Sequence, residues 1–190
     1  NGAIVHKRGM DLGLKIDKRI TDFRIHAERI ELNLTKKAYG RDGEISTKYL
    51  RAHMDEFKKI CIQKVRTMVR KYKKEIGKKC LIVVPPGDNC AIARAVAESL
   101  GDQATYLIGG HHMLKWTKTY QSEESKIADF RNNPKKRFLV VVNKCQIGFD
   151  MPELTSTIDL TMSQNVNLVV QRWGRLARRS DLVKGRKHYF

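Results

Sequence analysis

Four arginines lie close together near the end of the sequence. Arg172, Arg175 and Arg179 are spaced at i, i+3 and i+7, and Arg178 lies beside them. In a helix this spacing places several guanidinium groups close to one face, and their planar, permanently charged donors suit phosphate oxygens. A solvated basic helix surface accounts equally well for the same spacing. From the residues alone, both interpretations stay open.

A polar segment with a single glycine precedes this helix. It runs from Asn143 to Pro152, contains Gly148, and follows the apolar run Phe138 to Val142. That run is short and rich in β-branched residues, which predicts a buried parallel strand. Glycine permits a positive φ or a close approach of the backbone to a ligand, and ligands of open α/β sheets bind at the carboxyl ends of strands. The segment is therefore a candidate ligand-binding loop.

Alternating strands and helices are expected to position these two segments. We predict strands over 80–84, 104–108, 138–142 and 154–160, and helices from about 88 to 100, over 121–133 and from 166 to 179. Right-handed βαβ crossovers then require a parallel sheet with helices on both faces. The predicted fold class is α/β.

Residues 1–78 are predicted to form an extension that packs on this α/β lobe. Alternating apolar residues over 21–34 favour one or two strands, with a helix as the alternative. A long helix is expected from Ser46, its cap, to about Ile76, with Gly77 ending it.

The second half of this long helix is strongly basic. Between Lys58 and Lys79 the sequence has ten basic residues and one acid, Glu75. Such a face suits a phosphate backbone, but lysines also simply solvate long helices, and neither interpretation is preferred.

The whole chain carries 38 basic and 20 acidic residues, a formal charge of +18. This balance favours a polyanionic partner, and nucleic acid before an anionic membrane. Four cysteines without zinc-finger spacing indicate reduced intracellular thiols. The apolar runs are too short to span a membrane and no signal-peptide pattern is present, so a soluble cytoplasmic protein is expected. Because the chain starts at Asn1, we expect a fragment of a longer protein.

Two motifs resemble motifs V and VI of superfamily 2 helicases and translocases. They are Gln146-Ile147-Gly148-Phe149-Asp150 and the run from Gln171 to Arg178. The first motif and its surroundings look most like phage or bacterial DNA helicases and the motor subunits of restriction enzymes. The resemblance extends from about Lys79 to the end of the chain. It implies that residues 79–190 form the C-terminal RecA-like lobe of such a motor.

The resemblance also implies roles for individual residues. Arg175 and Arg178 match the catalytic arginines that reach across a cleft to the γ-phosphate of ATP. The residues that would bind the nucleotide are Gly148, Asp150, Gln171 and Gly174. The residues that would contact nucleic acid are Gly87, Asn143, Lys144, Gln146 and Arg172.

The sequence lacks a Gly-x-x-x-x-Gly-Lys-Ser/Thr loop and an Asp-Glu pair after an apolar strand. The family carries both on a first lobe, so ATP and Mg²⁺ would be held mainly by an N-terminal RecA-like lobe of the same protein. The expected function is the second motor lobe of an ATP-dependent helicase or translocase, with DNA favoured over RNA as its nucleic acid. The chain by itself is expected to be inactive and to have no metal site of its own. The alternative is a stand-alone basic nucleic-acid-binding module without catalysis.

Overall fold

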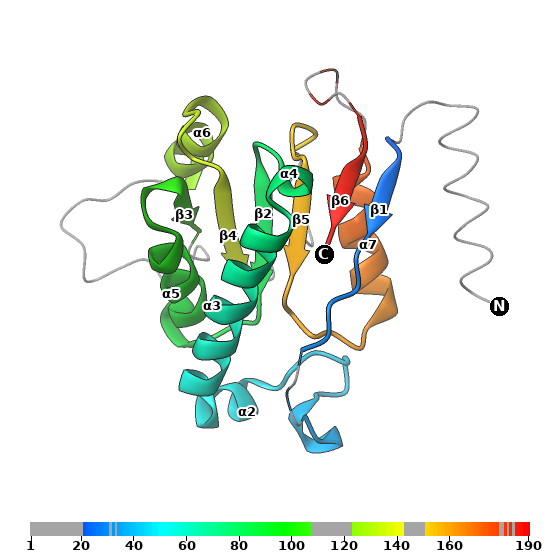
Figure 1. The fold of residues 1–190 in the computed structure, drawn as a ribbon. Helices are drawn as coiled ribbons and strands as arrows, with labels where there is room; N and C mark the ends of the chain where they lie inside the picture. The colour runs from blue at the N-terminus through cyan, green and yellow to red at the C-terminus, as the bar shows by residue number, and fades with distance from the viewer. Residues whose placement is uncertain are drawn as a thin grey trace.

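The chain folds around one sheet of six parallel strands, shown in Figure 1. The computed structural model describes residues 21–30, 32, 34–107, 123–142, 151–178, 181, 183 and 185–190. The strands are β1 (Phe23–Ile25), β2 (Cys80–Val84), β3 (Ala104–Tyr106), β4 (Phe138–Val142), β5 (Ser156–Asp159) and β6 (Lys187–Tyr189), and their order across the sheet is β1-β6-β5-β2-β4-β3.

The helices cover both faces of this sheet. They are α2 (Thr47–Ala52), α3 (Met54–Lys71), α4 (Lys73–Ile76), α5 (Ala91–Leu100), α6 (Glu123–Asn132) and α7 (Val166–Leu176), with short 3-10 turns η2 (Lys36–Ala38), η3 (Asp88–Cys90) and η4 (Gly101–Gln103). In Figure 1, α3 and α5 lie in front of the sheet and α7 lies behind β6 and β1.

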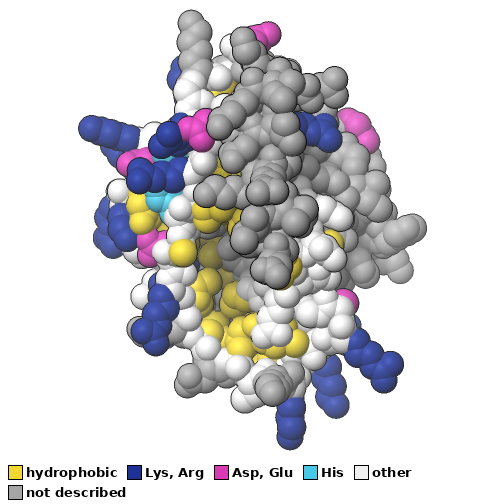
Figure 2. Space-filling view, turned by 90° about the vertical axis from the view of Figure 1, so that its right-hand side faces the viewer, with side chains coloured by type: hydrophobic (Ala, Val, Ile, Leu, Met, Phe, Trp, Pro, Cys, Tyr) yellow, Lys and Arg dark blue, Asp and Glu magenta, His cyan; other side chains and the backbone are white. Residues whose placement is uncertain are grey.

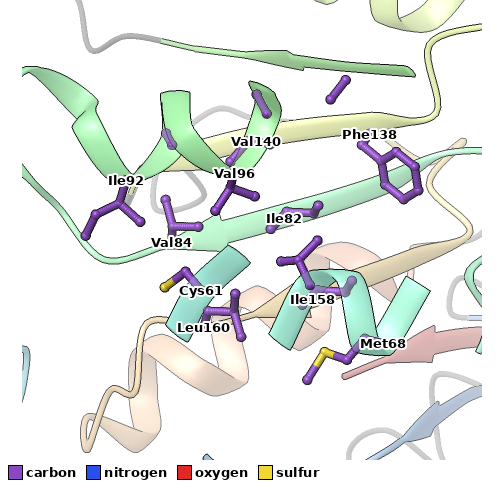
Figure 3. Close-up of a cluster of buried hydrophobic side chains, with 14 of the residues drawn as sticks. Cys61, Met68, Ile82, Val84, Ile92, Val96, Phe138, Val140, Ile158 and Leu160 are labelled. Carbon is purple, nitrogen blue, oxygen red and sulfur yellow. The ribbon is translucent and has the colours of Figure 1, made fainter. Parts of the chain in front are cut away.

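The alternation of side chains along β2 divides the core into two layers. Ile82 and Val84 lie in one buried cluster with residues of α3 and α5, drawn in Figure 3. Leu81 and Val83 lie in the other, with Phe130 of α6 and residues of α7. Successive side chains of a strand point to opposite faces, so a strand covered on both faces must be apolar throughout. The predicted RecA-like α/β fold, with a parallel sheet and helices on both faces, is confirmed.

The central strands have the predicted bounds, since β2 covers 80–84 and β4 covers 138–142. The strand predicted over 154–160 is shorter, because only Ser156–Asp159 joins the ladder while Leu154 and Leu160 are buried just outside it. The helix predicted over 121–133 is found as α6, which is described from Glu123 to Asn132.

The long helix predicted from Ser46 to Ile76 is divided into three. The backbone leaves the helical path at His53 (φ −124°, ψ 25°) and at Tyr72 (φ −112°, ψ 39°), so α2, α3 and α4 follow one another with single-residue breaks. The predicted ends are confirmed: the amide of Tyr49 donates to Ser46 Oγ at 3.2 Å, and Gly77 ends α4 with φ +71°. At His53, Nδ1 lies 2.9 Å from the carbonyl oxygen of Tyr49, so the ring competes with the backbone for that acceptor.

Residues before Lys79 take part in the same sheet and core. β1 pairs with β6, and the core that contains Ile82 also contains Phe57, Cys61 and Val65 of α3. The boundary predicted at residue 78 therefore separates two elements, α4 and β2, that contribute to one hydrophobic cluster. In the ranges that the structure describes, no helix is long and apolar enough to cross a membrane.

Candidate functional site

The carboxyl ends of β2, β4 and β5 meet at one edge of the sheet, because the three strands are parallel neighbours. Three segments leave this edge: residues 85–90 after β2, residues 143–150 after β4, and residues 160–165 after β5. The middle segment lies outside the described residues. With it lie five of the predicted site residues, Asn143, Lys144, Gln146, Gly148 and Asp150.

The third segment leads into α7, which carries the arginine motif. Asn165 caps the helix, since its Oδ1 accepts from the amide of Leu168 at 3.3 Å. Three of the predicted site residues, Gln171, Gly174 and Arg178, are exposed. Gln171 and Gly174 are spaced at i and i+3 within α7, so they lie close to one face of the helix, and Arg178 follows two residues after its end. A Cβ atom on Gly174 would meet no heavy atom within 4 Å. This face of α7 is open.

The backbone of Arg175 belongs to α7 and lies one turn before Arg178, while its side chain is outside the described part of the structure. The end of the motif is fixed by a buried lysine on β6. Lys187 Nζ donates to the carbonyl oxygens of Arg178 at 2.7 Å and Pro152 at 2.6 Å. The amide of Thr21 donates to the carbonyl oxygen of Ala177 at 2.7 Å. The backbone around Arg178 is thus tied to the strand beside it.

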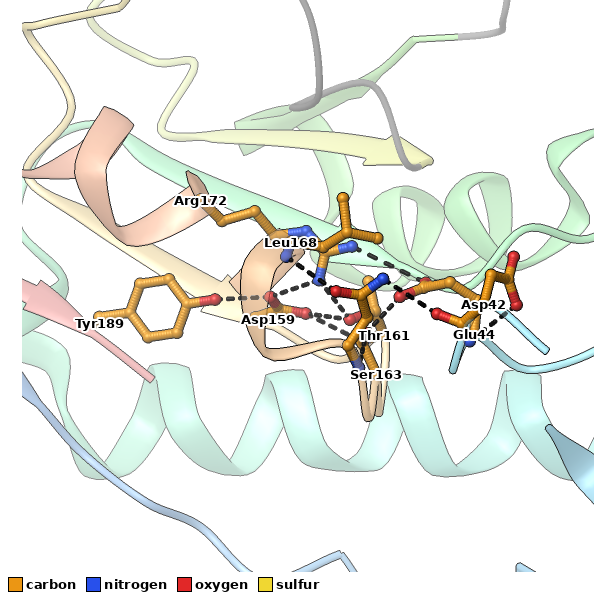
Figure 4. A network of polar contacts seen from close by, with 9 residues as sticks. Asp42, Glu44, Asp159, Thr161, Ser163, Leu168, Arg172 and Tyr189 are labelled. Carbon is orange, nitrogen blue, oxygen red and sulfur yellow. Dashed lines mark hydrogen bonds and ion pairs between the residues drawn. The ribbon is translucent and has the colours of Figure 1, made fainter. Parts of the chain in front are cut away.

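Arg172 faces the opposite way, into the protein. Its exposed fraction is 3%, and Nη1 donates to Asp159 Oδ2 at 3.1 Å and to Thr161 Oγ1 at 2.8 Å. Nη2 lies 3.8 Å from Glu44 Oε2, and the contacts are drawn in Figure 4. The resemblance implied a nucleic-acid contact for Arg172, and in this structure the side chain is buried against Asp159 and Thr161. The physical reason is that Asp159 ends a buried strand and offers a carboxylate that burial would otherwise leave unpaired.

Asp159 is the centre of this network. It also accepts hydrogen bonds from the hydroxyl of Tyr189 and from the amide and hydroxyl of Thr161, the last two at 2.9 and 2.6 Å. Burial, and then the neighbouring carboxylate, raise the pKa of Tyr189, so its hydroxyl remains a donor. Within the described residues, Nε and Nη2 of Arg172 have no hydrogen-bond partner.

The loop around Gly43 braces the start of α7. The carbonyl oxygen of Gly43 accepts from the amide of Gln164 at 2.9 Å, and Asn165 Nδ2 donates to the carbonyl oxygen of Asp42 at 3.0 Å. Ser163 Oγ is hydrogen-bonded to Glu44 Oε1. Glu44 and Asp159 were not among the residues predicted from the sequence, although an aspartate at the carboxyl end of a predicted parallel strand was a usable signal for Asp159.

Gly87 lies in the first of the three segments, and its backbone is extended (φ −141°, ψ 162°). A Cβ atom there would lie 3.2 Å from Met54 Cε and 3.4 Å from Ile92 Cγ1, so this glycine allows the turn to pack against α3 and α5. The helix predicted from about residue 88 starts as the 3-10 turn η3, and the carboxylate of Asp88 pairs with Arg51 at 2.9 Å. The residue that precedes α5 is Cys90, with φ +55°.

No group of three or more metal-ligating side chains is found in the described ranges. Cys61, Cys80 and Cys90 are buried free thiols, and burial raises the pKa of Cys61 and of Cys80 to about 12. A thiol with that pKa is protonated at neutral pH and is a poor metal ligand or nucleophile.

Comparisons with known proteins give the family. The chain is similar to the structure described as "Crystal structure of the C-terminal part of Fun30 ATPase domain", with 17% identity and a TM-score of 0.49, over 68% of this chain and 40% of that one. It is also similar to the Hef helicase domain of Pyrococcus furiosus, with 16% identity and a TM-score of 0.41, over 69% of this chain and 25% of that one. The chain therefore spans less than half the length of either structure.

A search of curated proteins found no match. The family model of the helicase conserved C-terminal domain matches residues 58–180, more than half of the chain. The matched range begins in α3 and includes β2, β4, β5 and all of α7. The chain belongs to the helicase conserved C-terminal domain family.

Proposed function

We propose that this chain is the second motor lobe of an ATP-dependent nucleic-acid helicase or translocase. It would work with an N-terminal RecA-like lobe that makes most of the contacts with ATP and Mg²⁺. The observation that carries the proposal is the family match together with the exposed motif residues Gln171, Gly174 and Arg178 on and just after α7. The first lobe would supply the phosphate-binding loop and the magnesium carboxylate that this sequence lacks.

The open face of α7 fits a nucleotide that is held by a partner lobe. Gly174 leaves free space at the surface, so a phosphate group can approach the helix backbone there. Gln171 would orient the nucleotide, while Arg175 and Arg178 would place positive charge beside the γ-phosphate as its bond breaks. Gly148 and Asp150 would complete the nucleotide contacts from the loop after β4.

Arg172 has a different part in this proposal. Its buried pair with Asp159 fixes the rotation of α7 about its own axis, and thereby decides which residues of the motif are exposed. We therefore propose it as a positioning residue. Its predicted contact with nucleic acid would require the guanidinium to leave Asp159 and Thr161.

Nucleic acid would lie at the carboxyl edge of the sheet, against Gly87, Asn143, Lys144 and Gln146. The formal charge of +18 supports a polyanionic partner. The similarity of the motif after β4 to phage and bacterial DNA helicases favours DNA over RNA and a motor of that kind.

The experiment is steady-state ATP hydrolysis by the full-length protein with a saturating nucleic acid. Arg175→Ala and Arg178→Ala should each lower kcat by about 10³-fold or more, with a much smaller change in KM, because arginine fingers act mainly in the transition state. Arg94→Ala, an exposed arginine on α5, is the matched control. The chain of residues 1–190 alone should hydrolyse no ATP.

An Arg175→Ala enzyme with unchanged kcat would remove this residue from the nucleotide cleft. If the full-length parent protein bound nucleic acid but hydrolysed no ATP, the motor proposal would fail. The alternative, a basic binding module without catalysis, would then be favoured by the charge of the chain.

A further inference from the structure

One side of α3 and α4 is a continuous basic surface. Its members are six exposed basic side chains: Lys59, Arg66 and Arg70 of α3, Lys73 and Lys74 of α4, and Lys78 just after α4. We call this set the α3 basic stripe. The opposite side of α3 carries Phe57, Cys61, Val65 and Met68, all buried in the core. Lys and Arg side chains project from the margin of Figure 2 on the side of the sheet that carries α3.

In the part of the chain that the structure describes, no carboxylate pairs with this stripe. Other lysines nearby are engaged: Lys71 pairs with Glu28 at 2.7 Å, Lys58 with Asp55 at 3.3 Å, and Lys64 donates to the carbonyl oxygen of Arg29. Within the stripe, Arg66 Nη2 donates to the carbonyl oxygen of Ser99 at 3.3 Å, a contact that leaves its charge without a counter-charge. Among the described residues, none of the six stripe members forms an ion pair with a carboxylate. No acidic residue occurs in the sequence between Lys59 and Lys74.

The arrangement works against the helix itself. Arg66 and Arg70 are i and i+4 neighbours of like charge within α3, a spacing that destabilises an isolated helix. A solvated helix surface normally alternates the sign of its charges. Because α3 receives its stability from the buried side, it can carry this repulsion, and the repulsion is relieved when an external polyanion lies along the stripe.

The shape of the stripe selects the polyanion. The 18 residues of α3 span about 27 Å at 1.5 Å per residue, and B-DNA carries one negative charge per ~1.7 Å of its axis. Sites for single strands add aromatic rings on which bases stack. The stripe has no such ring, since Phe57 is buried and Tyr72 is packed against Phe190 at 4.7 Å between ring centroids. A straight row of long cationic side chains without aromatic rings matches the backbone of a duplex.

The stripe also begins close to the proposed site. Met54, the first residue of α3, lies against Gly87 at the carboxyl edge of the sheet, and α4 ends near the start of β2 at the other edge. We propose that the α3 basic stripe binds the phosphate backbone of duplex DNA, without sequence preference, as a second contact that leads away from the Gly87 turn. This inference rests on the proposed function, because it treats the bound duplex as the substrate on which the motor acts.

The test is binding of a labelled 30-base-pair duplex DNA to the full-length protein without nucleotide, by fluorescence anisotropy between 50 and 200 mM salt. The stripe variant carries Arg66→Gln, Arg70→Gln and Lys74→Gln. The control variant loses the same charge from exposed positions elsewhere, with Lys37→Gln, Arg94→Gln and Lys135→Gln. Thermal unfolding should show that both variants are folded, with the stripe variant at least as stable as the parent because it loses the repulsion between Arg66 and Arg70.

The stripe variant should bind duplex DNA at least ~10-fold more weakly at low salt. Its plot of log affinity against log salt should be shallower by about 2 to 3, because each lost phosphate contact removes about 0.9 from the slope. The control variant should keep the parent slope. Equal slopes in the two variants would overturn the proposal, as would a loss confined to single-stranded DNA or to duplex RNA.

Hydrolysis separates this inference from the motor function. Arg175→Ala should abolish turnover and leave nucleotide-free duplex binding unchanged, while the stripe variant should still hydrolyse ATP when the nucleic acid is saturating. If the stripe variant bound duplex DNA normally and Arg175→Ala was inactive, the duplex site would be wrong and the motor function would stand.

Discussion

Arg172 and Asp159 form a buried ion pair, 3.1 Å between Nη1 and Oδ2, that joins the arginine-bearing helix α7 to the end of β5. Their side chains are 2% and 9% exposed. Both residues come from within the matched family range, whereas Glu44, 3.8 Å from the same guanidinium, precedes it. The orientation of α7 thus depends on residues from both parts of the chain.

Asp159→Asn should destabilise the fold by about 3–5 kcal/mol, because it leaves a buried guanidinium without its main counter-charge. Urea unfolding at pH 7 measures this loss. The matched control is Asp22→Asn, which breaks the exposed pair with Arg186 at 2.6 Å and should cost about 1 kcal/mol or less. Equal unfolding midpoints for the two variants would contradict the structural importance of the buried pair.

Two glycines with nearly the same backbone conformation allow steric overlap to be separated from backbone strain. Gly77 has φ +71° and ψ −151°, and Gly101 has φ +64° and ψ −147°. A Cβ atom on Gly77 would lie 2.7 Å from Thr155 Oγ1, whereas one on Gly101 would meet nothing within 4 Å. Alanine at either position should cost about 1–3 kcal/mol in backbone strain.

Gly77→Ala should therefore be less stable than Gly101→Ala by a further ~1–3 kcal/mol, the usual cost of overpacking. Thr155 has little room to move, because its hydroxyl is hydrogen-bonded to the carbonyl oxygens of Ile76 and Lys79, each at 2.7 Å. Chemical denaturation of the two variants side by side gives the difference. A Gly77→Ala protein as stable as Gly101→Ala would show that the Thr155 side chain moves aside at no cost.

Two histidines should make the stability of the sheet edge depend on pH. His26 Nε2 lies 2.9 Å from His188 Nδ1, joining the residue after β1 to β6, and His26 stacks on Phe190. Burial first, and nearby positive charges such as Arg24, lower the pKa of both histidines from the ordinary value of 6.5. Glu75 opposes these shifts without reversing them.

The unfolded chain therefore binds more protons than the folded chain as the pH falls below 6.5. Above pH 6.5 this pair should add no pH dependence to the free energy of unfolding. Below pH 6.5 the free energy of unfolding should decrease as the pH falls towards the lowered pKa values of the two histidines. Urea unfolding between pH 5 and 8 measures the slope for the parent, for His188→Gln and for the control His53→Gln. If His188→Gln retained the parent's slope in full, the pair would not be its source.

The central part of the fold was predictable because each buried parallel strand is apolar on both faces. The short apolar runs Cys80–Val84 and Phe138–Val142 have this pattern, and both strands have the predicted bounds. The edge strands carry no such signature. The alternation over 21–34 favoured one or two strands, and within the described residues only Phe23–Ile25 of that range forms one, with Ile25 46% exposed and its ladder made with β6.

The site was predictable only in part, for a different reason. Helical spacing places arginines three and seven residues apart close to one face, but it does not say which member of the row turns inward. Arg172 is buried because a carboxylate and a hydroxyl from outside the helix are available to it, and no periodicity in 166–179 reports their presence. Glu44 was missed because its contacts with Ser163 and with Arg172 of α7 join residues more than a hundred positions apart.

The pairing of β1 with β6 has a consequence for how the molecule folds. Residues 23–25 and 187–189 lie at opposite ends of the described chain, and their contact closes a loop that contains every other element of the sheet. Loop-closure entropy delays contacts of such sequence separation, so the ladder between these two strands should be among the last to form. During synthesis on the ribosome, β5 would keep an unpaired edge until residues 187–189 emerge. The lobe is therefore most prone to misassembly before β6 has left the ribosome and paired with β5.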